Sequence, residues 1–131
     1  MTILIGYVPT ATGEAAFEHG LEEAAVGGDD VVVLNSPRRG STVDAQLVDD
    51  AGADNLVARA HTAGVKARVD TTGHGADLVE PFQSTLASTG ARLVVIGLRR
   101  RSPVGKLVMG SDAQRLLLEL DVPVLAVKPP R

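Results

Sequence analysis

The sequence contains no cysteine and no tryptophan, and its 131 residues include only one tyrosine and two phenylalanines. Without cysteine, disulfide bonds, thiol catalysis and thiolate metal sites are excluded. So few aromatic side chains also argue against a surface on which nucleic-acid bases stack. The formal net charge of −3 argues against a nucleic-acid partner more generally. No apolar run approaches the roughly 18 residues that would span a membrane.

The start of the chain is strand-like and lacks the basic segment and cleavage site of a signal peptide. We therefore expect a cytoplasmic protein with neither a membrane nor a nucleic acid as its partner. The chain shows no linker, repeat or low-complexity segment, and its length suits one domain with a sizeable core. We expect a single domain over residues 1–131.

Five short runs of apolar and β-branched residues alternate with segments of helical periodicity. The runs cover residues 2–8, 31–35, 65–70, 93–96 and 124–127. This alternation predicts a single doubly wound α/β domain, in which a parallel sheet carries helices on both faces. The third run alternates apolar and polar residues and the fifth begins after Pro123, so both are expected near the sheet edges.

Two longer helices are predicted between the early strands. The first, over residues 14–26, should end at Gly27 and Gly28 and bury one stripe: Phe17, Leu21, Ala24 and Ala25. The second, over residues 43–63, should end at Gly64 and bury Val43, Leu47, Ala51, Val57 and Ala60. Its outward face would carry Asp49, Asp50 and Asp54.

A third helix should hold Pro81 in its first turn, where a missing amide does no harm. Phe82 and Leu86 would then face the core, and Gly90 would end the helix. A last short helix is predicted to start at Ser111, which is followed three residues later by Gln114 in a capping-box arrangement.

Two loops compete as the ligand site, because ligands of such sheets bind beyond the carboxyl ends of the strands. One follows the first apolar run, at residues 9–14, and the other follows the fourth run, over residues 97–111. The loop over residues 97–111 is the stronger candidate. Its Gly110 would let backbone amides approach a phosphate, and it carries four cationic side chains for anions: Arg99, Arg100, Arg101 and Lys106. Spacing alone leaves a second interpretation open, in which Ser111 only caps a helix and the arginines form a solvated turn.

The spacing in this loop resembles that of the universal stress proteins. The characteristic motif of that family begins with a glycine at the end of strand four. A second glycine follows after two intervening residues, and Gly-Ser or Gly-Thr follows after nine more. Here Gly97, Arg100 and the pair Gly110-Ser111 match that spacing, with arginine at the second glycine. The flanking phrases ARLVVIG and PVLAVK are also similar to those of the family.

The resemblance implies a Rossmann-like, flavodoxin-like sheet of order 3-2-1-4-5, as in adenine-nucleotide alpha-hydrolase-like folds, and a homodimer paired through strand five. One branch of the family binds ATP, with Mg²⁺, in this loop, and another holds no nucleotide. The resemblance and the loop together predict a nucleotide-responsive stress or regulatory module. The predicted nucleotide-binding residues are Gly97, Arg99, Arg100, Arg101, Gly110, Ser111 and Thr10.

Three departures from the family pattern bear on nucleotide binding. Arg100 replaces the second glycine, and Val8 stands where the family has an adenine-contacting aspartate at the end of strand one. Asp112 adds a carboxylate in the first turn of the last helix, where it favours the helix but repels phosphate. The alternative therefore stays open that the chain is a dimeric protein-interaction module without a nucleotide.

The first loop, PTATGE at residues 9–14, has a weaker resemblance to the phosphate loop of flavodoxins. Thr10, Thr12 and Gly13 fit that loop, but Ala15 stands where another hydroxyl is usual, and aromatic partners for a flavin are lacking. The favoured interpretation is that Thr10 or Thr12 caps the first helix. The loop would then line the same cleft as residues 97–111.

No catalytic constellation is evident in the sequence. The three histidines, His19, His61 and His74, have no metal-ligand spacing. The nucleophile elbow GxSxG, the phosphate loop GxxxxGK[ST] and an acidic pair after strand one are all missing from the sequence. We therefore predict no catalytic residue and no metal ligand, and we favour a binding protein over an enzyme.

Overall fold

The computed structural model describes residues 1–35, 48–71, 79–98 and 111–129, with only the backbone at Ser111 and Asp112. Its strands are β1 (Thr2–Tyr7), β2 (Asp30–Asn35), β3 (Ala67–Asp70), β4 (Leu93–Gly97) and β5 (Val124–Val127). Its helices are α1 (Ala11–Gly27), α3 (Asp50–Thr62), α4 (Val79–Thr89) and α5 (Ser111–Glu119).

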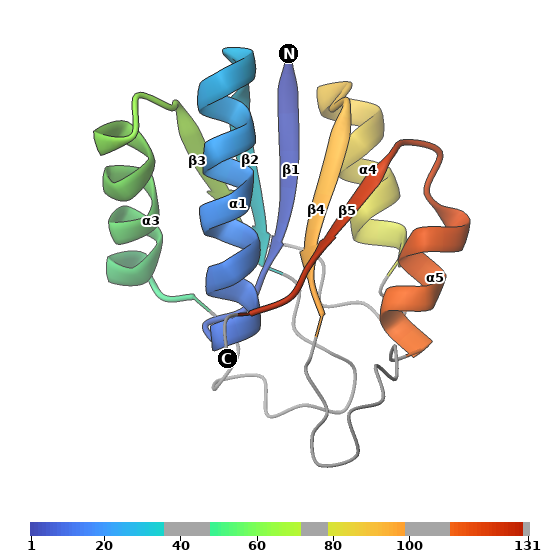
Figure 1. Cartoon of the computed structure of the whole chain (residues 1–131). Coiled ribbons are helices and arrows are strands. Elements are labelled where there is room, and N and C mark those ends of the chain that lie inside the picture. Colours follow the sequence, from blue (N-terminus) through green and yellow to red (C-terminus); the bar gives the residue numbers. More distant parts are fainter. Residues whose placement is uncertain (36–47, 72–78, 99–110, 130–131) are drawn as a thin grey trace.

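The five strands form one parallel sheet in the order β3-β2-β1-β4-β5. Helices α1 and α3 cover one face of this sheet, and α4 and α5 cover the other (Figure 1). The predicted doubly wound fold and its strand order are confirmed, as are the edge positions of β3 and β5. The order reverses between β1 and β4, so their carboxyl ends border the position where such folds bind ligands.

The core has two layers because the central strands are apolar on both sides. Ile3, Leu4 and Ile5 of β1 have no exposed surface, and Ile3 and Ile5 face one layer while Leu4 faces the other. Alternate side chains of a strand point to opposite faces. A short run without polar residues is therefore what a strand covered by helices on both faces requires.

Helix α1 begins at Ala11, three residues before its predicted start. Thr10 is its N-cap, and its Oγ1 accepts a hydrogen bond from the Gly13 N–H at 3.3 Å. The helix ends as predicted in a left-handed glycine, Gly28 with φ of 70°, whose N–H is bonded to the Ala24 carbonyl. Ala25 was expected in the buried stripe but is exposed, so Ala24 is the last residue of that stripe that is buried.

Helix α3 departs most from the prediction. It begins at Asp50, with Asp49 as its N-cap, rather than at residue 43. The residues buried on it are Leu56 and Ala60, whereas Ala51 and Val57 are exposed. The predicted inward positions Val43 and Leu47 lie outside the described residues. Thr62 is the last residue of the helix and Ala63 its C-cap, and Gly64 follows with a positive φ of 78°, as predicted for a glycine in that turn.

Helix α4 follows the prediction closely. Pro81 is its third residue, Phe82 is buried, and the left-handed Gly90 follows the helix with φ of 66°. The partly buried Leu86 packs against the same core layer. Among the described helices, none combines the length and the apolar character needed to cross a membrane.

A partly buried ion pair closes the end of the sheet opposite the ligand position. The Asp29 carboxylate is 2% exposed and accepts two hydrogen bonds from Arg92, from Nε at 3.1 Å and Nη2 at 2.7 Å. The guanidinium of Arg92 holds the pKa of Asp29 below its usual value, against the effect of burial. The pair ties the turn after α1 to the start of β4, two segments that are distant in the sequence.

Candidate functional site

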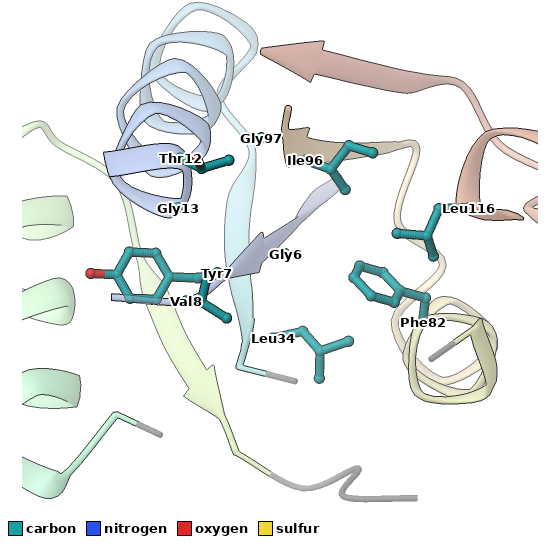
Figure 2. A pocket seen from close by; sticks show the side chains of 10 residues that line it. All are labelled: Gly6, Tyr7, Val8, Thr12, Gly13, Leu34, Phe82, Ile96, Gly97 and Leu116. Carbon is teal, nitrogen blue, oxygen red and sulfur yellow. The ribbon is translucent and has the colours of Figure 1, made fainter. Parts of the chain in front are cut away.

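A pocket lies at the carboxyl ends of β1 and β4, where the strand order reverses. The described residues that line it come from β1, the start of α1, β2, α4, β4 and α5. They are Gly6, Tyr7, Val8, Thr12, Gly13, Leu34, Phe82, Ile96, Gly97 and Leu116 (Figure 2). The first loop that the sequence singled out leads from β1 into α1 beside this pocket, and Gly97, where the second loop begins, lines it.

The walls of the pocket are mainly apolar. The side chains of Leu34, Phe82, Ile96 and Leu116 surround one side of the space, and all four belong to the core layer beneath α4 and α5. The Tyr7 ring extends the other way, with its hydroxyl directed out of the pocket (Figure 2). A flat, uncharged ring system would bury apolar area against such walls at about 25 cal/mol per Å².

Two glycines allow the start of α1 to pack against the strand ends. A β-carbon at Gly13 would overlap the carbonyl oxygen of Val8, and one at Gly97 would overlap that of Thr12. Both collisions involve backbone atoms, so neither can be relieved without a shift of the backbone. The predicted site glycine Gly97 therefore has a packing role, whatever the pocket binds.

A polar network supports the outer side of the pocket. The Tyr7 hydroxyl donates to Glu14 Oε1 at 2.5 Å, and Glu14 Oε2 accepts from Arg59 Nη2 at 2.7 Å. Burial, together with the bond to Glu14, raises the pKa of Tyr7, while the bond to Arg59 lowers the pKa of Glu14. The guanidinium carbon of Arg59 also lies 4.8 Å from the centre of the Phe17 ring. The network thus holds Tyr7 away from the pocket as a neutral phenol.

A fully buried asparagine fixes the end of β1. Asn35 Nδ2 donates to the carbonyl of Tyr7 at 3.0 Å, and Asn35 Oδ1 accepts from the N–H of Val48 at 2.8 Å. One side chain therefore joins the last residues of β1 and β2 to the segment that leads into α3. A buried polar group of this kind is stable only when it is hydrogen-bonded.

The residues predicted to bind nucleotide fall into three groups. Gly97 ends β4 and lines the pocket. Thr10 caps α1 and Ser111 is the first residue of α5, so both helix starts that the sequence predicted beside the site are present. Arg99, Arg100, Arg101 and Gly110 lie outside the described residues, as does Lys106.

The pocket also contains residues that the sequence did not assign to a site. Leu34, Ile96 and Leu116 had no role beyond strand or helix, and Phe82 was assigned to the core. Apolar side chains are expected both in a core and in the wall of an apolar pocket, so the residue types alone did not indicate a site. The only signal available was position, because Leu34 and Ile96 are near the ends of buried strands.

The described residues hold no group of three or more histidine, cysteine, aspartate or glutamate side chains placed to bind a metal ion. Mg²⁺ prefers to keep several waters and to bind through substrate phosphates. If it accompanies a nucleotide here, the phosphates would be its main ligands.

Comparison with known proteins places the chain in a family. The profile of the Universal stress protein family matches residues 1–128. A universal stress protein from Mycolicibacterium smegmatis is 41% identical over 127 residues, which are 97% of each chain.

Solved structures share the fold. A universal stress protein from Archaeoglobus fulgidus superposes with a TM-score of 0.76 and 24% identity over 98% of both chains. Another structure from Archaeoglobus fulgidus, a universal stress protein in complex with dAMP, has a TM-score of 0.70 and 19% identity, again over 98% of both chains. The sequence, the strand order and these matches agree that the chain belongs to the universal stress protein family.

Proposed function

We propose that this chain binds an adenine nucleotide in the pocket at the carboxyl ends of β1 and β4 and acts as a nucleotide-responsive regulatory module. The observation that carries the proposal is a mainly apolar pocket at the reversal point of the strand order. That position is where open α/β sheets bind ligands, and a family member of the same fold is seen in complex with dAMP.

The surroundings of the pocket suit the two ends of a nucleotide. Leu34, Phe82 and Leu116 provide apolar surface for a base. The start of α1 lies beside the strand ends, and α5 begins at the same end of the sheet (Figure 1). Helix N-termini favour anions through their unpaired N–H groups and their dipoles. We therefore place the base against the apolar walls and the phosphates toward the helix starts.

Calorimetric titration with AMP, and with ATP in the presence of Mg²⁺, tests this proposal. We expect dissociation constants near micromolar, equivalent to about 8 kcal/mol. Thr12→Glu should weaken the binding of AMP about tenfold, because a carboxylate at the pocket would repel phosphate at close range. The same substitution is compatible with the fold, since acidic residues stabilise the first turn of a helix.

Ala11→Glu is the matched control. It adds the same charge in the same helical turn, but Ala11 is exposed and is not among the described residues that line the pocket. Equal losses in both variants would argue against the placement of the phosphates beside Thr12. No binding of either nucleotide by the wild-type protein at millimolar concentration would leave the alternative, a protein-interaction module without a nucleotide.

We also propose that two copies of the chain pair through β5. This strand is the last in the described sheet, and β4 occupies its inner side. The carbonyls of Pro123 and Val127 accept hydrogen bonds from Val94 and Leu98. Because backbone groups alternate in direction along a parallel strand, those of Val124 and Ala126 point to the outer edge, which suits edge-to-edge pairing.

Sedimentation of Ala126→Pro tests the pairing. Proline would remove an outward N–H while leaving the bonds to β4 in place, and edge strands tolerate it. We expect the wild-type protein to sediment as a dimer and Ala126→Pro as a monomer. Ala126→Thr keeps the N–H and should remain a dimer. A wild-type monomer, or a proline variant that stays dimeric with unchanged affinity, would exclude pairing through this edge.

A further inference from the structure

We propose that the Phe82 ring sets the depth of the pocket, so that this side chain decides how large a base the site accepts. The inference rests on the proposed function, because it names a residue that determines the specificity of the same pocket. It follows from the contact between the Phe82 ring and Gly6, both of which line the pocket.

The Phe82 ring lies against the backbone of β1 at a residue that has no side chain. A β-carbon at Gly6 would be 2.8 Å from Phe82 Cζ and 3.2 Å from Cε1, so the ring tip occupies the space that a side chain there would take. The next nearest atom, Ile96 Cγ2, would be 3.5 Å away, an ordinary contact distance. Gly6 lies within β1 and its φ is not positive, so alanine would suit the backbone at this position.

The Phe82 ring belongs both to the core and to the pocket wall. The residue is 3% exposed and is part of the core layer beneath α4 and α5. Leu34, Ile96 and Leu116 of the same layer line the pocket around it, and Figure 2 shows the ring directed from α4 toward β1. Close packing leaves a core side chain little room. The pocket is therefore the open space into which the ring can turn.

This position makes the ring a limit on the size of the ligand. A flat base that is buried against the apolar walls would rest on the Phe82 ring, and an alkyl group on that edge of the base would collide with it. Overpacking a closely packed site is unfavourable, and one methylene group in an apolar pocket changes affinity by about 10- to 200-fold. We therefore expect the site to reject bases that carry an alkyl group on the edge facing Phe82.

Gly6→Ala tests the contact, because its methyl group would push the ring tip into the pocket. The collision involves the outer end of a side chain that can turn, so the fold should persist. We expect this variant to bind AMP about tenfold more weakly in calorimetric titration. In the Phe82→Leu background, where Cζ is missing, the same Gly6→Ala change should weaken binding less than about threefold, as expected for two residues in contact.

Leu86→Ala is the matched control background. Leu86 is one helical turn from Phe82 and packs against the same core layer, but it is not among the described residues that line the pocket. The Gly6→Ala change should therefore keep its full effect on AMP binding in the Leu86→Ala background. Thermal unfolding of each variant without nucleotide confirms that it is folded.

A second measurement tests the size limit without Gly6→Ala. It compares AMP with analogues that carry a methyl group on N6, C2 or C8 of the base. The wild-type protein should bind at least one of them about tenfold more weakly than AMP, and Phe82→Leu should bind that analogue within about threefold of AMP. Leu86→Ala should keep the wild-type preference. Each preference is a ratio within one protein, so a general loss of stability would not change it.

The outcomes separate the inference from the proposed function. The inference would be overturned if Gly6→Ala had no effect on AMP binding or had the same effect in the Phe82→Leu background. It would also be overturned if the wild-type protein bound every methylated analogue as well as AMP, or if Phe82→Leu left the rejection unchanged. All of these results leave AMP binding, and thus the proposed function, in place. Failure of the wild-type protein to bind AMP would overturn both.

Discussion

Gly13→Ala should destabilise the protein by about 3 kcal/mol, the upper range for overpacking a tightly packed site. The added β-carbon would overlap the Val8 carbonyl oxygen, and the Val8 nitrogen would be 2.8 Å away. Because these are backbone atoms, the start of α1 would have to move away from the end of β1. That movement would also disturb the cap, since the Gly13 N–H is bonded to Thr10 Oγ1.

Urea unfolding at equilibrium measures this effect, and Gly52→Ala provides the control. Gly52 is also in the first turn of its helix, but a β-carbon there would meet only side-chain atoms, the nearest being Val48 Cγ1 at 3.0 Å. Alanine is the better helix former by about 1 kcal/mol, so Gly52→Ala should be neutral or stabilising. A Gly13→Ala variant as stable as wild type would show that α1 is not held this closely to β1.

The packing of Gly13 also shapes the pocket, because Gly13, Val8 and Thr12 all line it. If α1 shifts to make room for a methyl group, these residues shift with it. A Gly13→Ala variant that remains folded should therefore bind AMP more weakly than Gly52→Ala does.

The sequence predicted best the strands that are buried on both faces and the turns that contain a glycine with positive φ. The buried strands are nearly continuous apolar runs, and β5 has the predicted bounds, residues 124–127. The glycines at 28, 64 and 90 all have positive φ, where residues other than glycine are rarely found. Such local signals do not depend on which other part of the chain packs against them.

Helix α3 shows why other positions could not be predicted. Among its described residues the predicted stripe ran through Ala51, Val57 and Ala60, and the fold buries Ala60 together with Leu56 while Ala51 and Val57 are exposed. The choice depends on the angle at which the helix meets the sheet. The N-cap role of Asp49 was not predicted either, because an aspartate is common both on an exposed helical face and at an N-cap.

The polar contacts around the pocket were beyond prediction because they join distant parts of the chain. Glu14 and Arg59 are 45 residues apart, and each was an ordinary charged residue in its own helix. Two features that the sequence singled out for the ligand site, Gly97 and the turn into α1, lie beside the pocket. The sequence could not show that much of the wall would be apolar core residues.

Asn35→Ala should destabilise the protein by about 2–4 kcal/mol. It would leave two partners without the bonds that Asn35 supplies, the Tyr7 carbonyl and the Val48 N–H. Each buried group left unsatisfied costs about 1–3 kcal/mol, and the space left by the side chain adds to that loss. Asn55→Ala on the exposed surface of α3 is the control and should change stability little. Equal stability of the two variants in urea would contradict the role of Asn35.

Asn35→Asp separates the two hydrogen bonds, and its pH dependence has a definite sign. The aspartate keeps an acceptor for Val48, but when ionised it has no donor for the Tyr7 carbonyl. Burial would raise the pKa of the new carboxyl in the folded protein above its unfolded value of about 3.9. The folded state would then hold the proton more tightly, so the variant should be closest to wild-type stability below about pH 4. The difference from wild type should grow as the pH rises through the folded-state pKa. A difference in urea midpoint that stays constant from pH 4 to pH 8 would show that the donor to Tyr7 contributes little.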